Sequence, residues 1–234
     1  MERRDGQAGR LLVWIGGWAS SVEAWRSRIE AAYPQWSHAY VAVEEVQDLD
    51  AENLTEFVKS IGGSGAVAVA WSLGSQLALR AWNARVWPQD MPLVAVCPVV
   101  EFCAEKGPWK PMVLNRMIRG LGRDREAVLE DFRKLMWSGM PADLAEAWRN
   151  EAAKIADEAL VRGLELLRDG VLGTIRAGQG LVLVEASQDR VSPGLAAVLS
   201  DGELALHEVR ELGAGHVPFL EDVAGFRRIL SELD

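Results

Sequence analysis

Residues 66–74 read AVAVAWSLG, and this stretch decides the fold of the chain. Small and β-branched apolar residues come first, Ser72 stands between a tryptophan and a leucine, and residues 76–80 continue with helical character. This order predicts a buried strand, a sharp turn that carries Ser72, and a helix. Such a turn exposes a serine hydroxyl at the carboxyl edge of a sheet, so Ser72 is a candidate nucleophile.

Strand and helix patterns alternate on both sides of this stretch. Apolar runs typical of strands occur at residues 11–15, 38–43, 92–97, 181–185 and 204–209. Helical patterns occur at residues 22–32, 50–61, 73–86, 193–199 and 219–233. The alternation predicts an α/β domain whose parallel sheet is covered by helices on both faces.

The alternation stops between residues 99 and 167, where no strand pattern is found. Helical periods take its place, at residues 112–121, 124–137, 142–149 and 157–167. A block of helices inside a strand–helix series is typical of an inserted cap. We therefore predict one α/β domain built from residues 1–98 and 168–234, with a helical cap insertion at residues 99–167.

The composition narrows the class of protein. The chain has 234 residues, 49% of them hydrophobic, and a formal net charge of −9, which argues against a nucleic-acid partner. No apolar run approaches the roughly 18 residues of a membrane span, and the N-terminal MERRDGQAGR lacks the apolar core of a signal peptide. We expect a cytoplasmic monomer. Two cysteines and three histidines provide neither a disulfide framework nor a histidine-rich metal centre.

Charge is unevenly distributed along the chain. Residues 106–134 contain eight basic and four acidic side chains, which gives +4 and leaves −13 for the remainder. A basic segment on an acidic body is compatible with an anionic partner, and equally with a solvated helix face.

A serine nucleophile needs a base and an acid that orients it. His216 is the candidate base, because it lies in the glycine-containing loop GAGHVP between the last strand and the last helix. Asp189 is the candidate acid, because it follows the strand at residues 181–185. Glu101 is the alternative acid. The carboxyl ends of parallel strands share one edge of the sheet, so Ser72, Asp189 and His216 are expected to meet there.

Two backbone N–H groups are the candidate oxyanion hole. One belongs to Leu73, directly after the nucleophile, and the other to Trp18, in the loop after the first strand. Trp18 is also placed to wall the pocket, whereas we assign the Trp71 and Leu73 side chains to packing of the turn. The remaining histidines, His38 and His207, fall in strand patterns and are interpreted as structural. This chemistry requires neither a metal nor a cofactor.

These motifs resemble those of α/β-hydrolases. They are Gly16-Gly17-Trp18, Trp71-Ser72-Leu73-Gly74, Asp189 with Val191 and Pro193, and Gly215-His216-Val217-Pro218-Phe219. More narrowly, the chain resembles the pimeloyl-[acyl-carrier-protein] methyl ester esterases of biotin synthesis at the start and end of the cap. That resemblance is carried by Cys97-Pro98, Phe102, Trp109-Lys110-Pro111, Leu114, Phe132, Leu135 and Gly163-Leu164-Glu165-Leu166-Leu167.

The resemblance implies a function and further site residues. Ser72 is then the nucleophile that hydrolyses the methyl ester of a pimeloyl group held by acyl-carrier protein. Trp18, Phe132 and Met136 are implied to contact the acyl chain. The basic cap segment is a candidate contact for the acidic carrier protein, through Arg123, Arg125, Arg133 and Lys134.

The sequence departs from the family pattern at a few positions. Gly16 stands where the family usually has histidine, and Ala70 stands where the serine turn usually has its first glycine. Ala127 and Asp131 occupy positions where cap arginines are expected.

Two other functions remain open at the level of sequence. The same triad would serve a carboxylesterase or thioesterase that acts on small or medium acyl esters without a carrier protein. A non-catalytic binding protein on a hydrolase fold is the third reading, and the complete set of triad residues argues against it.

Overall fold

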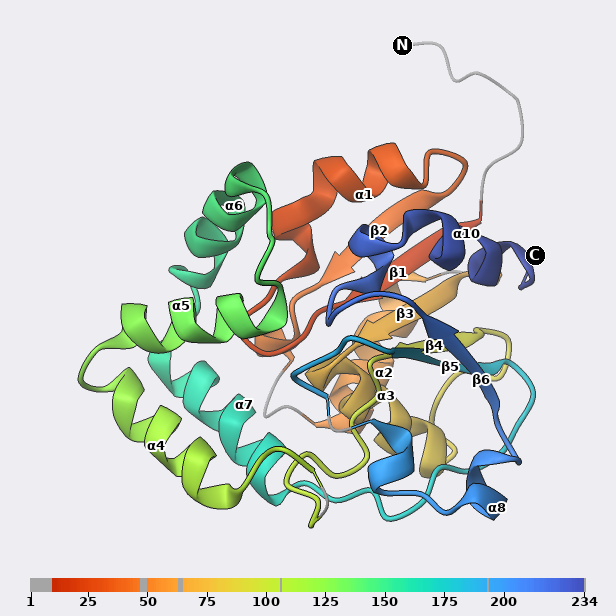
Figure 1. Ribbon diagram of the computed structural model, residues 1–234. Coiled ribbons are helices and arrows are strands. Elements are labelled where there is room, and N and C mark those ends of the chain that lie inside the picture. Colours follow the sequence, from red (N-terminus) through yellow and green to blue (C-terminus); the bar gives the residue numbers. More distant parts are fainter. Residues whose placement is uncertain (1–9, 47–49, 63–64, 106, 193, 234) are drawn as a thin grey trace, which may run out of the picture.

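The computed structural model describes residues 10–46, 50–62, 65–105, 107–192 and 194–233. Within them, a single sheet has the strand order β2-β1-β3-β4-β5-β6, and every neighbouring pair is parallel (Figure 1). The strands are β1 (Leu11–Ile15), β2 (Ser37–Val41), β3 (Val67–Trp71), β4 (Leu93–Val96), β5 (Leu181–Ala186) and β6 (Glu208–Leu212). The predicted parallel sheet is thereby confirmed. Of the N-terminal segment MERRDGQAGR, in which no signal peptide is predicted, only Arg10 is among the described residues. Lys106 and Pro193 also lie outside them.

Helices follow most of the strands. The α-helices are α1 (Arg26–Ala32), α2 (Ala51–Ile61), α3 (Leu73–Asn83), α4 (Pro111–Leu121), α5 (Arg125–Met136), α6 (Ala142–Ala152), α7 (Asp157–Asp169), α8 (Asp201–Leu204), α9 (Pro218–Glu221) and α10 (Val223–Ser231). Short 3₁₀ helices are η1 (Val22–Trp25), η2 (Val43–Glu45) and η4 (Leu195–Ala197). No helix in the described part of the chain combines the length and apolar character needed to cross a membrane.

The middle of the sheet explains the apolar runs of the sequence. Every residue of β3 is buried, and so is every residue of β4. A parallel strand that is covered on both faces has no solvated side, so its sequence is continuously apolar instead of alternating. The stretch at residues 66–71 therefore specifies an interior strand, and β3 lies between β1 and β4.

Side-chain caps start two of the predicted helices. The Asp50 carboxylate accepts hydrogen bonds from the backbone N–H groups of Glu52 and Asn53, which begins α2 at the expected place. Ser21 caps the next segment by accepting from Glu23 N. There the chain forms η1 before α1, so the helix predicted at residues 22–32 is two shorter pieces.

The C-terminal third contains further wrong predictions of secondary structure. The strand predicted at residues 204–209 lies later, at β6, because Ser200 and Glu203 form a capping box that starts the short helix α8. His207 consequently lies in the bend before β6. The helix predicted at residues 219–233 is interrupted at Asp222, whose side chain accepts from Gly225 N and starts α10. In the helical stretch predicted at residues 193–199, the described residues 194–199 form only η4.

Helices α4 to α7 lie between β4 and β5 in the sequence, where the helical insertion was predicted. In Figure 1 they gather on one side of the molecule, beyond the carboxyl ends of the strands. An isolated antiparallel bridge between Glu101 and Val171 brings the start and the end of this segment together. The chain therefore leaves the sheet before α4 and returns to it after α7 at neighbouring points beyond the carboxyl ends of the strands.

A buried aromatic cluster packs against β1. The Trp14 ring contacts Tyr33, Phe219 and Phe226, which come from the chain segments around α1, α9 and α10. His38 belongs to the same cluster: its Nδ1 accepts from Trp14 Nε1 at 3.0 Å, and its Nε2 lies 3.1 Å from the Tyr33 carbonyl. Only the neutral imidazole with its proton on Nε2 satisfies both contacts.

This cluster predicts a pH-dependent stability. Burial lowers the pKa of His38 below its ordinary 6.5, so the unfolded chain binds a proton more readily than the folded one. The contribution of His38 is complete above pH 6.5 and is lost as the pH falls towards the lower folded-state pKa. In urea unfolding, His38→Leu should be less stable than wild type near neutral pH, with the difference shrinking in mild acid. A difference that is constant with pH would contradict this role of His38.

Candidate active site

Ser72 lies in a strained turn between β3 and α3. Its φ of 55° is in the left-handed region, which costs a non-glycine residue of order 1–3 kcal/mol. A Cβ on Gly74 would lie 2.3 Å from the Gly16 carbonyl oxygen, so α3 approaches the end of β1 as closely as only glycine allows. Ala70, where the family pattern has glycine, is a buried residue inside β3 and leaves the turn intact.

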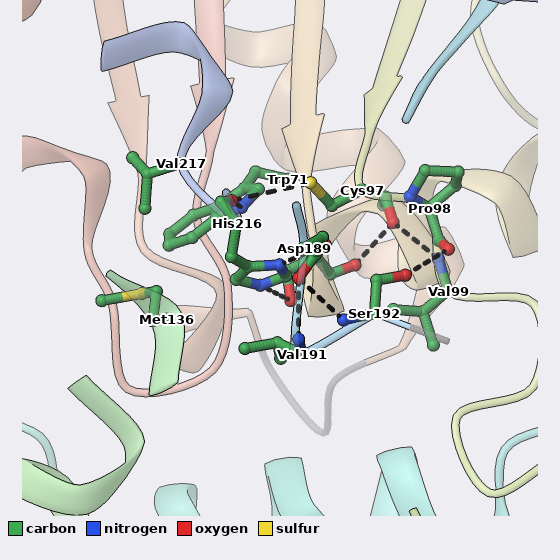
Figure 2. Close-up of polar contacts among 12 residues, drawn as sticks. Trp71, Cys97, Pro98, Val99, Met136, Asp189, Val191, Ser192, His216 and Val217 are labelled. Carbon is green, nitrogen blue, oxygen red and sulfur yellow. Dashed lines mark hydrogen bonds and ion pairs between the residues drawn. The ribbon is translucent and has the colours of Figure 1, made fainter. Parts of the chain in front are cut away.

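Three of the predicted side chains form one hydrogen-bonded chain, and Figure 2 labels two of them, Asp189 and His216. His216 Nε2 lies 3.0 Å from Ser72 Oγ, and His216 Nδ1 lies 2.8 Å from Asp189 Oδ2. Ser72 is 3% exposed and His216 is 1% exposed, so the contacts are shielded from water. The carboxylate that contacts His216 is that of Asp189, and not that of the alternative acid, Glu101.

Asp189 is held as an acceptor by its own loop. Its Oδ1 accepts from the backbone N–H groups of Val191 and Ser192, at 2.7 and 3.1 Å. Burial raises the pKa of Asp189, but the attraction of His216 and the hydrogen bonds to the carboxylate outweigh it, so the net pKa lies below the ordinary value. Asp189 is therefore ionised near neutral pH and fixes the proton of His216 on Nδ1.

The backbone of His216 is anchored by residues that the sequence analysis did not assign to the site. Trp71 Nε1 donates to the His216 carbonyl at 2.7 Å, and Cys97 Sγ lies 3.6 Å from the same oxygen. Glu221 Oε1 accepts from Val217 N at 3.0 Å and supports the next residue. The position of Trp71 beside the nucleophile was visible in the sequence, but the partner of its indole N–H was not. Trp71 thus does more than pack the turn.

The loop after β1 lies directly against the nucleophile. A Cβ on Gly17 would lie 3.0 Å from the Cβ of Ser72, so this glycine brings the backbone before Trp18 next to the serine. Leu73 is the first residue of α3, where backbone N–H groups have no partner within the helix. Gly16 stands where the esterases that the sequence resembles have histidine. The backbone leaves no room for a side chain at this position, because a Cβ on Gly16 would lie 2.5 Å from the Ser20 carbonyl oxygen.

The predicted acyl-contact residues pack over this loop. The rings of Trp18 and Phe132 meet edge to face, with centroids 4.8 Å apart. Trp18 Nε1 donates to the Leu160 carbonyl in α7 at 2.8 Å. Met136 Sδ lies 3.8 Å from the hydroxyl of Ser20, in the same loop. Trp18, Phe132 and Met136 are therefore adjacent to the serine turn and are all buried.

The four basic residues predicted to contact a carrier protein differ in their surroundings. Arg125 donates to the carbonyls of Ala152, Ala153 and Ile155, at the end of α6. Arg133 is buried and forms a two-point pair with Glu130, at 3.0 and 2.7 Å. This pairing, with Arg149, lowers the pKa of Glu130 to about 2. Arg123 and Lys134 are exposed on the surface.

One group of potential metal donors occurs among the described residues. The donor atoms of Cys97, Asp189 and His216 all lie within 4.8 Å of one another. Burial, and then the charge of Asp189, raise the pKa of the Cys97 thiol, so it is held in the protonated form that binds metals poorly. The hydrogen bond between Asp189 and His216 engages two of the three donors.

The parallel sheet, the strained serine turn after β3 and the histidine before α9 together define the class of α/β hydrolases. The model of the alpha/beta hydrolase family matches residues 12–229, so the chain belongs to this family. The predicted α/β-hydrolase fold is confirmed. No curated protein matches the sequence.

Solved structures share the whole fold at low sequence identity. An esterase from Exiguobacterium antarcticum is 15% identical in sequence and superposes with a TM-score of 0.77. The match covers 97% of this chain and 92% of the esterase chain. A bromoperoxidase from Bacillus anthracis is 13% identical with a TM-score of 0.75, covering 96% and 91%. An enol-lactonase from Burkholderia xenovorans LB400 is 14% identical with a TM-score of 0.73, covering 99% and 93%. At these identities the likeness concerns the fold.

The contacts of Arg125 predict a role in stability. Arg125→Ala removes the donor to three carbonyls at the end of α6, and we expect a loss of about 2 kcal/mol in the free energy of unfolding. Arg123→Ala, two residues away and exposed, is the matched control and should stay within about 0.5 kcal/mol of wild type. Urea unfolding measures both. Equal stabilities of the two variants would show that the Arg125 contacts contribute nothing.

Proposed function

We propose that this protein is a serine carboxylesterase that works through an acyl-enzyme on Ser72. The observation that carries the proposal is the buried chain from Ser72 Oγ through His216 to Asp189, with distances of 3.0 and 2.8 Å. A serine hydroxyl is a weak nucleophile by itself, and an adjacent, oriented imidazole makes it a strong one.

The geometry supports the following sequence of steps. Ser72 Oγ attacks the ester carbonyl while its proton passes to His216 Nε2, and Asp189 stabilises the imidazolium that forms. The backbone N–H groups of Leu73 and Trp18 are the proposed donors to the oxyanion. Collapse of the tetrahedral intermediate releases the alcohol, which takes the proton from His216. A water molecule, activated by His216, then cleaves the acyl-enzyme to the carboxylic acid and free Ser72.

Two of the neighbouring structures are named an esterase and an enol-lactonase, which is in keeping with an acyl substrate, and a third is named a bromoperoxidase. A thioesterase would use the same groups, so that activity is the alternative within the same chemistry. A binding protein without activity would not need the ordered contacts of His216 with both Ser72 and Asp189.

We further propose that α4 to α7 form a cap, over residues 99–167, and that the substrate is the methyl ester of pimeloyl-[acyl-carrier protein]. The support for this substrate is the sequence resemblance and the basic character of residues 106–134. Arg125 and Arg133 make contacts within the protein. Of the four basic residues predicted to contact the carrier protein, Arg123 and Lys134 are therefore the two that are exposed enough to do so.

Replacement of the nucleophile tests the proposed reaction. Ser72→Ala should lower kcat for a short p-nitrophenyl ester by a factor of the order of 10⁶. Asp189→Asn should lower it by about 10⁴, because the imidazole is then held in the wrong tautomer. Steady-state kinetics and circular dichroism of the same samples separate loss of activity from loss of fold. Activity that survives in Ser72→Ala would refute the assignment of the nucleophile.

The carrier-bound substrate has a direct test. Incubation with the methyl ester of pimeloyl-[acyl-carrier protein] should lower the mass of the loaded carrier by that of one methylene group, because methanol is released and a carboxylic acid is left. Mass spectrometry of the carrier measures this change, with Ser72→Ala as the blank. An unchanged carrier beside rapid turnover of short esters would favour a carboxylesterase that needs no carrier.

A further inference from the structure

One carboxylate beside the candidate active site has no part in the proposed steps. It belongs to Glu221, the last residue of α9, and it lies against the backbone on both sides of His216. Its Oε1 accepts from Val217 N at 3.0 Å, and a Cβ on Gly215 would lie 3.0 Å from each of its two oxygens. The residues directly before and after the candidate base therefore both lie against one carboxylate.

Helix α9 is itself anchored, so this carboxylate is presented from a fixed element. The hydroxyl of Tyr33 donates to the Phe219 carbonyl at 2.6 Å. The Phe219 ring is buried and packs edge to face on Trp71, with ring centroids 5.5 Å apart. Trp71 in turn donates to the His216 carbonyl. The segment around His216 is thus held by Trp71 at a carbonyl and by Glu221 at a backbone N–H group.

The charge of Glu221 lacks a permanent cationic partner. Glu221 is partly buried, yet no lysine or arginine in the described part of the chain forms an ion pair with it. The ionisable groups that act on it are His216 and Asp189, and its own charge acts on the Cys97 thiol. Burial is the largest influence and raises the pKa of Glu221 above its ordinary value. A stabilising ion pair therefore does not explain why a carboxylate stands here.

We propose that Glu221 is a positioning residue for the esterase reaction, which holds the backbone beside His216 and supplies a second negative charge for the imidazolium. When the Ser72 proton moves to His216 Nε2, a positive charge appears near two carboxylates. Asp189 stabilises it through the hydrogen bond at Nδ1, whereas Glu221 acts through space, in surroundings shielded from water. The cationic partner of Glu221 is thus formed during the reaction. This inference rests on the proposed esterase function and adds a residue to it.

Two substitutions separate the backbone contact from the charge. Glu221→Gln keeps an oxygen that can accept from Val217 N but loses the charge, so kcat for p-nitrophenyl acetate should fall about tenfold with KM unchanged. The acid limb of the pH profile of kcat/KM should also move to lower pH, because protonated His216 loses the attraction of a negative charge. Glu221→Ala loses the acceptor as well and should lower kcat about a hundredfold, since His216 is then poorly placed.

Stability distinguishes this role from a purely structural one. Because the pKa of Glu221 is raised, its contribution to stability is present below pH 4.5 and is lost as the pH rises through the higher folded-state pKa. In urea unfolding at neutral pH, Glu221→Gln should therefore be at least as stable as wild type, although it is slower. Asp222→Asn is the matched control, because Asp222 is the next residue and its carboxylate accepts from Gly225 N at 2.9 Å, at the start of α10. It should leave kcat and the pH profile unchanged.

Labelling by a fluorophosphonate separates this inference from the function on which it rests. Ser72 Oγ bonds to phosphorus, fluoride leaves and the proton passes to His216, so the rate, measured by mass spectrometry of the protein, needs no ester substrate. Glu221→Gln should be labelled about tenfold more slowly than wild type. Wild-type protein that is not labelled at Ser72 would refute the esterase, and this inference with it. Equal rates in the two proteins, an equal loss in Asp222→Asn, or a Glu221→Gln protein less stable than wild type would overturn the role of Glu221 and leave the esterase standing.

Discussion

The site depends on the backbone of Ser72, which is held with a positive φ at the point where β3 becomes α3. That conformation is unfavourable for serine by itself, and it persists because the chain on each side is fixed. Before it, β3 is buried and paired on both edges; after it, α3 packs so closely on the end of β1 that Gly74 has no room for a side chain. The stability of the central sheet is thus used to aim one hydroxyl group.

The parallel sheet also explains how distant residues reach this hydroxyl. Ser72 and His216 are 144 residues apart in the sequence, but each follows a strand, and all six strands present their carboxyl ends at one edge. Proximity alone does not orient an imidazole. The carbonyl of His216 is held by Trp71, next to the nucleophile, and contacted by Cys97, at the end of β4. The base is therefore positioned in part by β3, the strand that ends at the serine.

Indole N–H groups join the helices above the sheet to the loops below them. Trp18 donates to Leu160 O in α7, and Trp148 in α6 donates to Ser20 Oγ at 2.7 Å. Such bonds satisfy polar atoms that burial would otherwise leave unpaired, while the rings fill the interior. The consequence is a covered serine, so the reactants must reach it past side chains of α5 and α7.

The sequence by itself determined the sheet, because fully apolar strands and a serine turn followed by a glycine are compatible with few other folds. It also placed Ser72, Asp189 and His216 at strand ends. It misplaced β6, because the local capping box at Ser200 starts a helix where the apolar spacing resembles a strand. Only the tertiary structure decided the partners of long polar side chains. Arg125 and Arg123 are two residues apart and alike in sequence. Arg125, at the start of α5, binds the end of α6, whereas Arg123, in the turn before α5, faces solvent, because the packing of α5 against α6 covers only the first of them.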